Sequence, residues 1–282
     1  MQIELGGEEL GFRTIGWGGV HSSRTLMLAD LRLLLEVASP TATSQEYKDL
    51  ILSSNVLSKK TQTTREEAWT RLRRLYALDH TTPVFNYFRY LWYRDEASRP
   101  LLALLLAIAR DPLLRLSISV ILTSSEGEVV TKDWVMDALQ SASGDHFNET
   151  TRATIVRNIL SSWTQAGFLQ GEQIKVRHIV GPAAAGVAYA AYLAFLCGVR
   201  GSRIFESGWV SMLGINTSQV QAYLKDASKH GWLTYRGLGD VVEIDFPLAL
   251  LKQAYANDLE TRSDSNYGDH SPRLNNLQEA LV

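Results

Sequence analysis

The chain has little of what most catalytic and secreted proteins need. It carries one cysteine, Cys197, among 282 residues, which excludes an internal disulfide and any zinc site built from several thiolates. Its six histidines are scattered without the short spacing of metal ligands. Neither a phosphate-loop motif nor a nucleophile-elbow motif is present. We therefore expect a protein that is not an enzyme and that needs no cofactor and no metal.

An excess of charge of one sign is also lacking. Lys and Arg number 28 against 30 Asp and Glu, which gives a formal net charge of −2. This balance excludes a polycation but leaves room for local basic surfaces. Acidic charge gathers at the two ends, with −2 over residues 1–22 and −3 over residues 258–282. These acidic ends mask basic surfaces in between, and this sorting points toward DNA.

The start of the chain, MQIELGGEEL, lacks the basic and apolar regions of a secretory leader. The longest uncharged run, Ile179–Val199, has 21 residues and is long enough to cross a bilayer. Its strongly apolar residues favour insertion by only about 2–4 kcal/mol, and Pro182, glycines and tyrosines oppose it. We expect a buried helix in a cytoplasmic protein, with a membrane span as the alternative.

The pattern of caps and apolar spacing predicts a mainly α fold. Residues 1–20 are expected to be a flexible, acidic and Gly-rich lead, and residues 21–125 an all-helical domain. Ser22 or Ser23 is the predicted N-cap of the first helix, and capping boxes at Thr43 and Thr64 open the next two. Further helices are predicted over residues 82–93, 99–109 and 112–122.

Beyond this domain we expect two winged-helix-like modules with short β-hairpins, residues 126–180 and 181–256. Each has a helix that ends at a glycine and leads into a hairpin. The helices are predicted over 149–166 and 218–229, with Asn148 and Asn216 or Thr217 as caps. Residues 257–282 are polar, and we expect them to be disordered.

The two modules align at a constant offset of 64 residues. Matching pairs share apolar character or glycine, and they are Val156/Val220, Leu160/Leu224, Gly167/Gly231, Phe168/Trp232 and Leu169/Leu233. A repeat of a whole helix–glycine–strand unit is more specific than any one of its residues. The alternative explanation of this alignment is chance, because unrelated helices commonly end at a glycine.

Each module places residues that suit DNA on the helix face opposite its apolar stripe. These residue types bind phosphates and base edges. In the first module they are Thr154, Arg157, Ser161 and Gln165, with Lys175 and Arg177 on the hairpin. In the second they are Ser218, Gln221, Lys225 and Lys229, with Arg236 on the hairpin. A solvated helix face and a protein-binding surface are the alternatives.

A third basic cluster surrounds the third helix of the helical domain. It consists of Lys59, Lys60, Arg65, Arg71, Arg73 and Arg74, and with two nearby glutamates its net charge is +4. Cations at this density neutralise phosphates and make affinity for nucleic acid depend on salt.

The order of several segments resembles a known family. Gly18-Gly19 leads to Ser22-Ser23-Arg24, and the stretches NVLSKK (from Asn55), LLALLLAIARDP (from Leu101) and TRATIVRNILSSWTQAGFLQG (from Thr151) follow. Over about residues 14–180 this resembles BrxA, the small helical accessory protein of BREX bacteriophage-exclusion systems. The resemblance implies a non-enzymatic, helical protein whose winged-helix-like region binds DNA. The second module lies beyond the usual end of that family.

We therefore expect a DNA-binding accessory protein of a bacterial anti-phage system. Its partners would be double-stranded DNA and other defence subunits: a methyltransferase, a phosphatase-like protein and an ATPase. A winged-helix scaffold that docks those subunits is the first alternative. A transcriptional regulator is the second, and it would need a stable dimer and a palindromic site.

Overall fold

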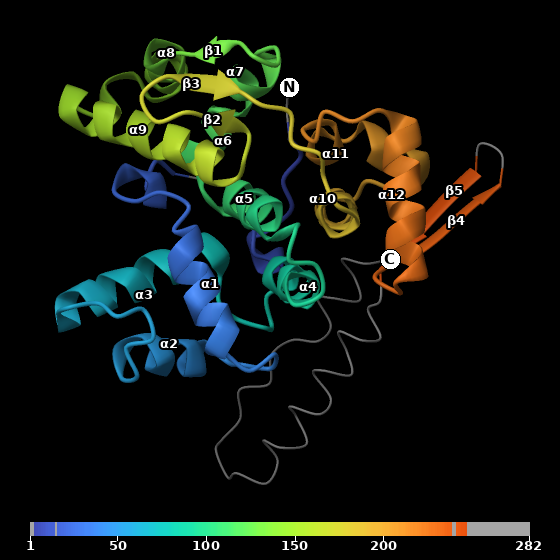
Figure 1. Ribbon diagram of the computed structural model, residues 1–282, viewed down its shortest axis with the longest axis horizontal. Coiled ribbons are helices and arrows are strands. Elements are labelled where there is room, and N and C mark those ends of the chain that lie inside the picture. The colour runs from blue at the N-terminus through green and yellow to red at the C-terminus, as the bar shows by residue number, and fades with distance from the viewer. Residues whose placement is uncertain (1–2, 15, 239–240, 247–282) are drawn as a thin grey trace, which may run out of the picture.

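The computed structural model describes residues 3–14, 16–238 and 241–246 (Figure 1). As predicted, the chain is mainly helical, with a few short antiparallel strands in two small sheets. The α-helices are α1 (Leu28–Val37), α2 (Ser44–Leu52), α3 (Gln62–Tyr76), α4 (Pro83–Trp92), α5 (Arg99–Arg110), α6 (Pro112–Leu116), α7 (Ile118–Thr123), α8 (Lys132–Ser143), α9 (Glu149–Gln165), α10 (Ala184–Leu196), α11 (Gly208–Ser211) and α12 (Thr217–Lys229). The strands are β1 (Val129–Val130), β2 (Leu169–Gln170), β3 (Lys175–Arg177), β4 (Thr234–Leu238) and β5 (Val241–Asp245), and the 3-10 helices are η1 (Glu8–Leu10), η2 (Val20–Ser22), η3 (Gly144–His146) and η4 (Gly201–Glu206).

The leucine-rich helix α5 lies at the centre of the molecule. Its residues from Leu101 to Ala109 are all buried, and it packs against α3, α4, α6, α9 and α10. A helix that is apolar on every side is stable in water only when neighbours cover all of it. The other helices are therefore arranged around α5.

The uncharged run near residue 190 forms α10, in which every side chain is buried. Small residues let α10 lie close to α4, α5, α11 and α12. Its tyrosines find polar partners inside the core, where the Tyr189 hydroxyl donates to the Val84 carbonyl at 2.9 Å. Across the described ranges, none of the helices is both long and apolar enough to span a bilayer.

The lead over residues 1–20 differs from the expected flexible segment, since its described part packs into the core. Leu10 and Phe12 are 5% and 1% exposed. The Arg13 N–H donates to the Ala109 carbonyl at 3.0 Å, and the Trp209 indole N–H donates to the Glu4 carbonyl at 2.8 Å. The apolar side chains that stand between the glycines and glutamates pack into the core, and this packing orders the segment although its overall composition is polar.

Three helix boundaries also differ from the predicted ones. The first helix begins at Leu28 instead of Ser22 or Ser23, after Met27 in a left-handed conformation with φ 51°. The cap of α3 is Thr61, whose capping box closes with Thr64. The expected helix 112–122 is broken at Ser117, which bonds the indole of Trp163 at 2.7 Å. The apolar spacing of residues 112–122 is typical of one continuous helix, but the contact between Ser117 and Trp163 lies where the helix breaks.

The two predicted repeats form similar helix–hairpin units. We call α8, α9 and strands β1–β3 the first unit, and α12 with β4 and β5 the second unit. Gly167 and Gly231 both end their helices with positive φ, 86° and 70°. The residue after each glycine donates its N–H to a carbonyl in the last turn of its helix, Phe168 to Trp163 and Trp232 to Ala227, each at 3.0 Å. The equivalent apolar positions on α9 and α12 are buried.

The sheets are small and antiparallel. In the first unit the strand order is β1-β3-β2, and in the second β4 pairs with β5 from Thr234↔Asp245 to Leu238↔Val241. The boundaries proposed for the domains stay predictions. The predicted tail 257–282 and the end of the module 181–256 lie outside the described residues.

Candidate nucleic-acid interface

Helix α12 presents a line of polar and basic residues. It begins at a capping box formed by Asn216 and Gln219. The residues of the line are spaced by three or four positions, so they share one helix face, and they are Ser218, Gln221, Lys225 and Lys229. Ser218 and the two lysines are exposed and Gln221 is half-buried. The opposite stripe of Val220, Leu224 and Ala227 is buried, and α12 packs against α10.

The hairpin β4–β5 lies beside this helix (Figure 1). The Lys225 ammonium is 5.9 Å from the ring centroid of Tyr235 on β4. Arg236 is 71% exposed and pairs with Glu243 across the hairpin at 3.2 Å. An exposed pair of this kind is worth at most about 1 kcal/mol, so Arg236 is readily released to another anion.

The equivalent face of α9 in the first unit is partly covered by the chain's own N-terminal segment. The Gln165 side-chain oxygen accepts from the Leu28 N–H at 3.3 Å, and Ser162 accepts from the Leu26 N–H at 2.8 Å. Thr154 and Ser161 are half-buried, and Arg157 is exposed. Of the predicted residues on α9, Arg157 is therefore the one that projects most freely.

Both basic residues of the first hairpin donate to backbone carbonyls of the same unit. Lys175 donates to the Gly171 carbonyl at 2.5 Å. Arg177 is 7% exposed and donates to the Phe168 and His178 carbonyls. Burial lowers the pKa of Arg177, against the attraction of Glu126. The structure thus places Arg177 in the core of the first unit and not on its surface.

The six basic residues around α3 do not form a single surface. Lys59 pairs with Asp30 at 2.8 Å, and Arg71 pairs with Glu67 at 2.7 Å. Arg65 donates to the Leu52 carbonyl at the end of α2, at 3.1 Å. Three of the six cations are therefore engaged with neighbouring groups of the protein.

The remaining three point in different directions. Lys60 is exposed, and the exposed Arg73 guanidinium is 5.8 Å from the ring centroid of Trp69 on the same helix. Arg74 is half-buried and lies against Gly18, where a Cβ would come within 2.6 Å of its Nη2. Successive helix positions differ by about 100°, so this scatter follows from the spacing.

The described residues offer little support for a metal site or a reactive thiol. In the part of the chain that the structure describes, no group of three or more His, Cys, Asp or Glu side chains is placed to hold an ion. Burial raises the pKa of Cys197 to about 11. Its thiol is hydrogen-bonded to the Glu4 carbonyl at 3.3 Å. A thiol with a raised pKa is a poor nucleophile.

Residues 19–120 match the family model described as BrxA. The protein is BrxA-like. This likeness implies a BREX-associated protein. The BrxA-like stretch runs from Gly19 into α7, so it includes the arginine-rich helix α3 and excludes both helix–hairpin units. The comparison with curated proteins finds no match.

Two solved structures are similar to the BrxA-like chain over almost its whole length. One, described as "SspB crystal structure", is 13% identical with a TM-score of 0.52, and the match covers 98% of each chain. The other, described as "Magnesium ion-bound SspB crystal structure", is 13% identical with a TM-score of 0.48 and covers 96% and 97%. At this identity the first likeness shows the fold alone. The fold it shows includes the second unit, beyond the BrxA-like stretch.

The BrxA-like stretch also contributes to a buried network that sequence patterns did not reveal. His21 Nδ1 lies 2.8 Å from Asp111 Oδ2, and His21 Nε2 lies 2.8 Å from Ser162 Oγ. The order of groups is that of a serine-hydrolase triad. However, His21 and Ser162 are fully buried, and Ser162 also bonds the Asn158 carbonyl and the Leu26 N–H. A serine enclosed in this way cannot meet a substrate, so the network is structural.

The electrostatics of Asp111 agree with a structural role. Burial alone raises the pKa of its carboxyl. The attraction of His21, together with hydrogen bonds from His21 and Leu114, outweighs burial and holds that pKa below its ordinary value. The only signal for this network in the sequence is Asp111-Pro112, a helix start, because its members lie up to 141 positions apart.

Proposed function

We propose that this BrxA-like protein is a non-catalytic, cytoplasmic DNA-binding subunit of a BREX-type anti-phage system. The observation that carries the proposal is the line Ser218–Gln221–Lys225–Lys229 on α12, in which Ser218 and both lysines are exposed and Gln221 is half-buried. Lysines supply phosphate contacts, and Ser and Gln side chains suit phosphates or base edges. Because Arg236 lies on the adjacent hairpin, helix and hairpin can contact one duplex together.

The arrangement of elements supports the same proposal. The first unit follows α7 directly, so that α7, β1, α8, α9, β2 and β3 succeed one another, with β1 and β2 both paired to β3. This is the order of a winged helix, in which the last helix enters a groove and the hairpin contacts the backbone. The second unit follows α10 and α11, and the order α10, α11, α12, β4 and β5 repeats the scheme without the first strand.

The two units are not equivalent as binding surfaces. On α9, Gln165 is tied to Leu28, whereas Lys229, which stands 64 positions later, is exposed. Ser161 is half-buried, and its counterpart Lys225 is exposed. We therefore assign duplex contact to the second unit and give the first unit a structural role.

The test is fluorescence anisotropy with a labelled duplex over a range of salt. The wild type should bind with an affinity that falls steeply as salt rises. Lys225→Glu with Lys229→Glu should weaken binding and flatten the salt dependence by about two ion equivalents. A matched control, Lys48→Glu with Lys132→Glu, makes the same charge change on α2 and α8, away from α12 (Figure 1). Equal loss in both variants, or no binding by the folded wild type at low salt, would refute the proposal.

A second candidate function is docking of other defence subunits, and exposed apolar residues on the first unit favour it. Val129, Trp134 and Ile174 are 46%, 40% and 65% exposed. Val129 pairs with Val176 on β3, and Ile174 directly precedes β3, so two of the three are neighbours. Co-purification with the methyltransferase, the phosphatase-like protein and the ATPase of one such system tests this. Trp134→Ser with Ile174→Ser should abolish it while duplex binding is retained.

A further inference from the structure

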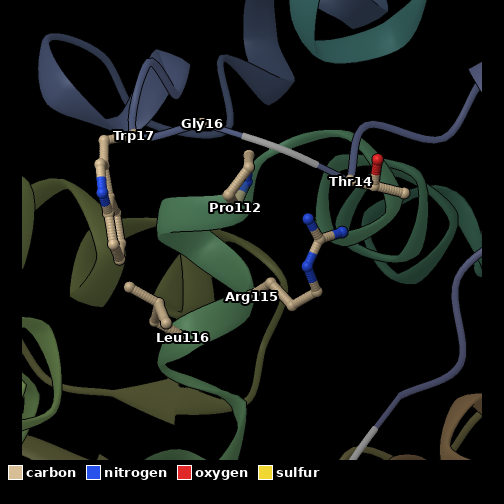
Figure 2. A pocket seen from close by; sticks show the side chains of 6 residues that line it. All are labelled: Thr14, Gly16, Trp17, Pro112, Arg115 and Leu116. Atoms are coloured by element: carbon tan, nitrogen blue, oxygen red, sulfur yellow. The ribbon is translucent and has the colours of Figure 1, made fainter. Parts of the chain in front are cut away.

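A pocket of about 420 Å³ lies between the glycine-rich lead and α6. It is lined by Thr14, Gly16, Trp17, Pro112, Arg115 and Leu116. Figure 2 shows the indole of Trp17 and the side chain of Leu116 at one end, and Arg115 and Thr14 at the other. The pocket thus has an aromatic, apolar end and a cationic, polar end. Its volume falls in the range of small-molecule sites, about 300–1,000 Å³.

The Arg115 guanidinium holds the loop that forms the pocket. It donates to the Ile108 and Ala109 carbonyls at the end of α5 and to the Arg13 carbonyl in the lead. These acceptors are neutral carbonyls, so the positive charge of Arg115 is not cancelled by an ion pair with any described residue. Arg115 therefore fixes the position of the lead against the end of α5, and it places a positive charge without an ion-pair partner at the cationic end of the pocket.

Two further arginines beside the pocket lack anionic partners. Neither the Arg13 nor the Arg74 guanidinium has a hydrogen bond or ion pair with any residue that the structure describes, and Arg74 Nε is buried without an acceptor. Burial, followed by repulsion from Arg74, lowers the pKa of Arg13, although Asp111 and Glu8 oppose the shift. Unpaired, mutually repelling cations of this kind cost stability unless an anion joins them.

The glycines bring these groups together. Arg74 fills the space that a Cβ at Gly18 would need, one residue after Trp17. Asp111 fills the corresponding space at Gly19, 2.1 Å from an added Cβ. Asp111 is hydrogen-bonded to His21. Its charge attracts Arg13 and Arg115, but among the described residues it forms no ion pair with either of them. The segment from Gly16 to Gly19 therefore carries the aromatic wall of the pocket and contacts Arg74 at Gly18.

We propose that this pocket binds an unpaired nucleobase that carries a phosphate. The base lies against Trp17 and Leu116, and the phosphate lies beside Arg115 at the cationic end. Arg13, which precedes Thr14, and Arg74, which lies against Gly18, add positive charge from outside the lining. Every base has a π-face, so stacking on an aromatic ring is tolerant of sequence, and arginine is well suited to phosphate. The site goes beyond duplex binding by α12 and uses none of its residues.

The same chemistry has two sources, a free nucleotide or a base in single-stranded DNA. The test uses 2-aminopurine, a base whose fluorescence is quenched on stacking, as a free nucleotide and within a short single strand. Quenching of both probes identifies a nucleotide ligand, and quenching of the strand alone identifies a DNA-borne base. Either result supports the site. No quenching of either probe by the folded protein overturns it.

Variants assign the effect to the pocket. Trp17→Leu should weaken binding by between about 5- and 150-fold and remove the quenching, as expected for the loss of one stacked base. Trp17→Phe should restore part of it. Trp134→Leu, at an exposed tryptophan on α8 outside the pocket, should change nothing. Quenching that survives Trp17→Leu would show that the base lies elsewhere and overturn the proposal.

The arginines need their own comparison. Arg13→Gln with Arg74→Gln should weaken binding of the phosphorylated probe and leave the unphosphorylated 2-aminopurine nucleoside nearly unchanged. Arg94→Gln with Arg203→Gln, which removes two exposed charges elsewhere, should have no effect on either. The Lys225/Lys229 variant should retain quenching, and Trp17→Leu should retain duplex binding. The two proposals can thus fail independently.

Discussion

Nδ1 of His21 lies 2.8 Å from Oδ2 of Asp111, with the two side chains 0% and 1% exposed. The backbone N–H of His21 donates to the same oxygen at 3.1 Å. The other carboxylate oxygen accepts from the backbone N–H of Leu113 at the start of α6. Through His21 Nε2 the network reaches Ser162 on α9. One carboxylate thus connects the N-terminal segment, the junction of α5 and α6, and the first helix–hairpin unit.

Asp111→Asn should destabilise the protein strongly. Removal of one partner from a buried pair costs about 3–5 kcal/mol, because the other partner is left without compensation. Urea unfolding followed by circular dichroism measures the free energy of unfolding. Asp30→Asn is the control, since it breaks the partly exposed pair with Lys59 and should cost at most about 1 kcal/mol. Equal costs for the two variants would show that the buried network does not stabilise the fold.

Alkaline pH should unfold the protein cooperatively. Burial raises the pKa of Tyr76, Tyr87 and Tyr189 well above the ordinary value. In the unfolded chain these hydroxyls ionise near pH 10. The stability that depends on their protons is therefore complete below about pH 10 and is lost as pH rises toward the folded-state pKa values.

The measurement is the ultraviolet absorbance of tyrosinate together with far-ultraviolet circular dichroism. Part of the tyrosinate signal should appear at the same pH as the loss of helix. Tyr76→Phe should reduce that cooperative part. Complete ionisation of the tyrosines in a protein that keeps its helices would contradict this explanation.

The accuracy of the sequence-based prediction follows the range of the interactions involved. The caps at Thr43, Asn148 and Asn216 form as predicted, because a capping side chain and its partner lie three residues apart. The start of the first helix was predicted wrongly, because the Leu26 N–H finds its acceptor in Ser162 on α9. No local pattern reports a partner 136 positions away.

The same distinction applies to the site. The spacing on α12 is enough to place Lys225 and Lys229 on one face, and both are exposed. The equivalent spacing on α9 carries the same information, but the face there is partly covered by the segment from His21 to Leu28. Arg177 and Arg236 both stand on predicted hairpins, and only the packed structure shows that Arg177 lies inside.

The repeated glycines should respond alike to substitution. Gly167→Ala and Gly231→Ala each force a side chain into a positive-φ conformation, φ 86° and 70°, which costs about 1–2 kcal/mol. Space is not limiting, since an added Cβ meets only Val180 at 3.6 Å in the first case and nothing within 4 Å in the second. Gly181→Ala has the same free space without a positive φ and should cost nothing. Thermal or urea unfolding of the three variants measures this, and unequal costs at 167 and 231 would argue against equivalent helix ends.

Arg177 lies on the second strand of the first hairpin and Arg236 on the first strand of the second hairpin, and substitution should separate their roles. Arg177→Gln removes hydrogen bonds from a buried guanidinium to the Phe168 and His178 carbonyls and should lower the free energy of unfolding by about 1.5–3 kcal/mol. Arg236→Gln removes only an exposed pair with Glu243 and should change the free energy of unfolding by no more than about 1 kcal/mol.

For duplex binding we expect the opposite, with the larger effect from the substitution of Arg236. Arg236→Gln should reduce the salt dependence by about one ion equivalent, and folded Arg177→Gln should keep it. If Arg177→Gln instead weakened duplex binding while unfolding was unchanged, the first hairpin would contact DNA, and the assignment of duplex binding to the second unit would be wrong.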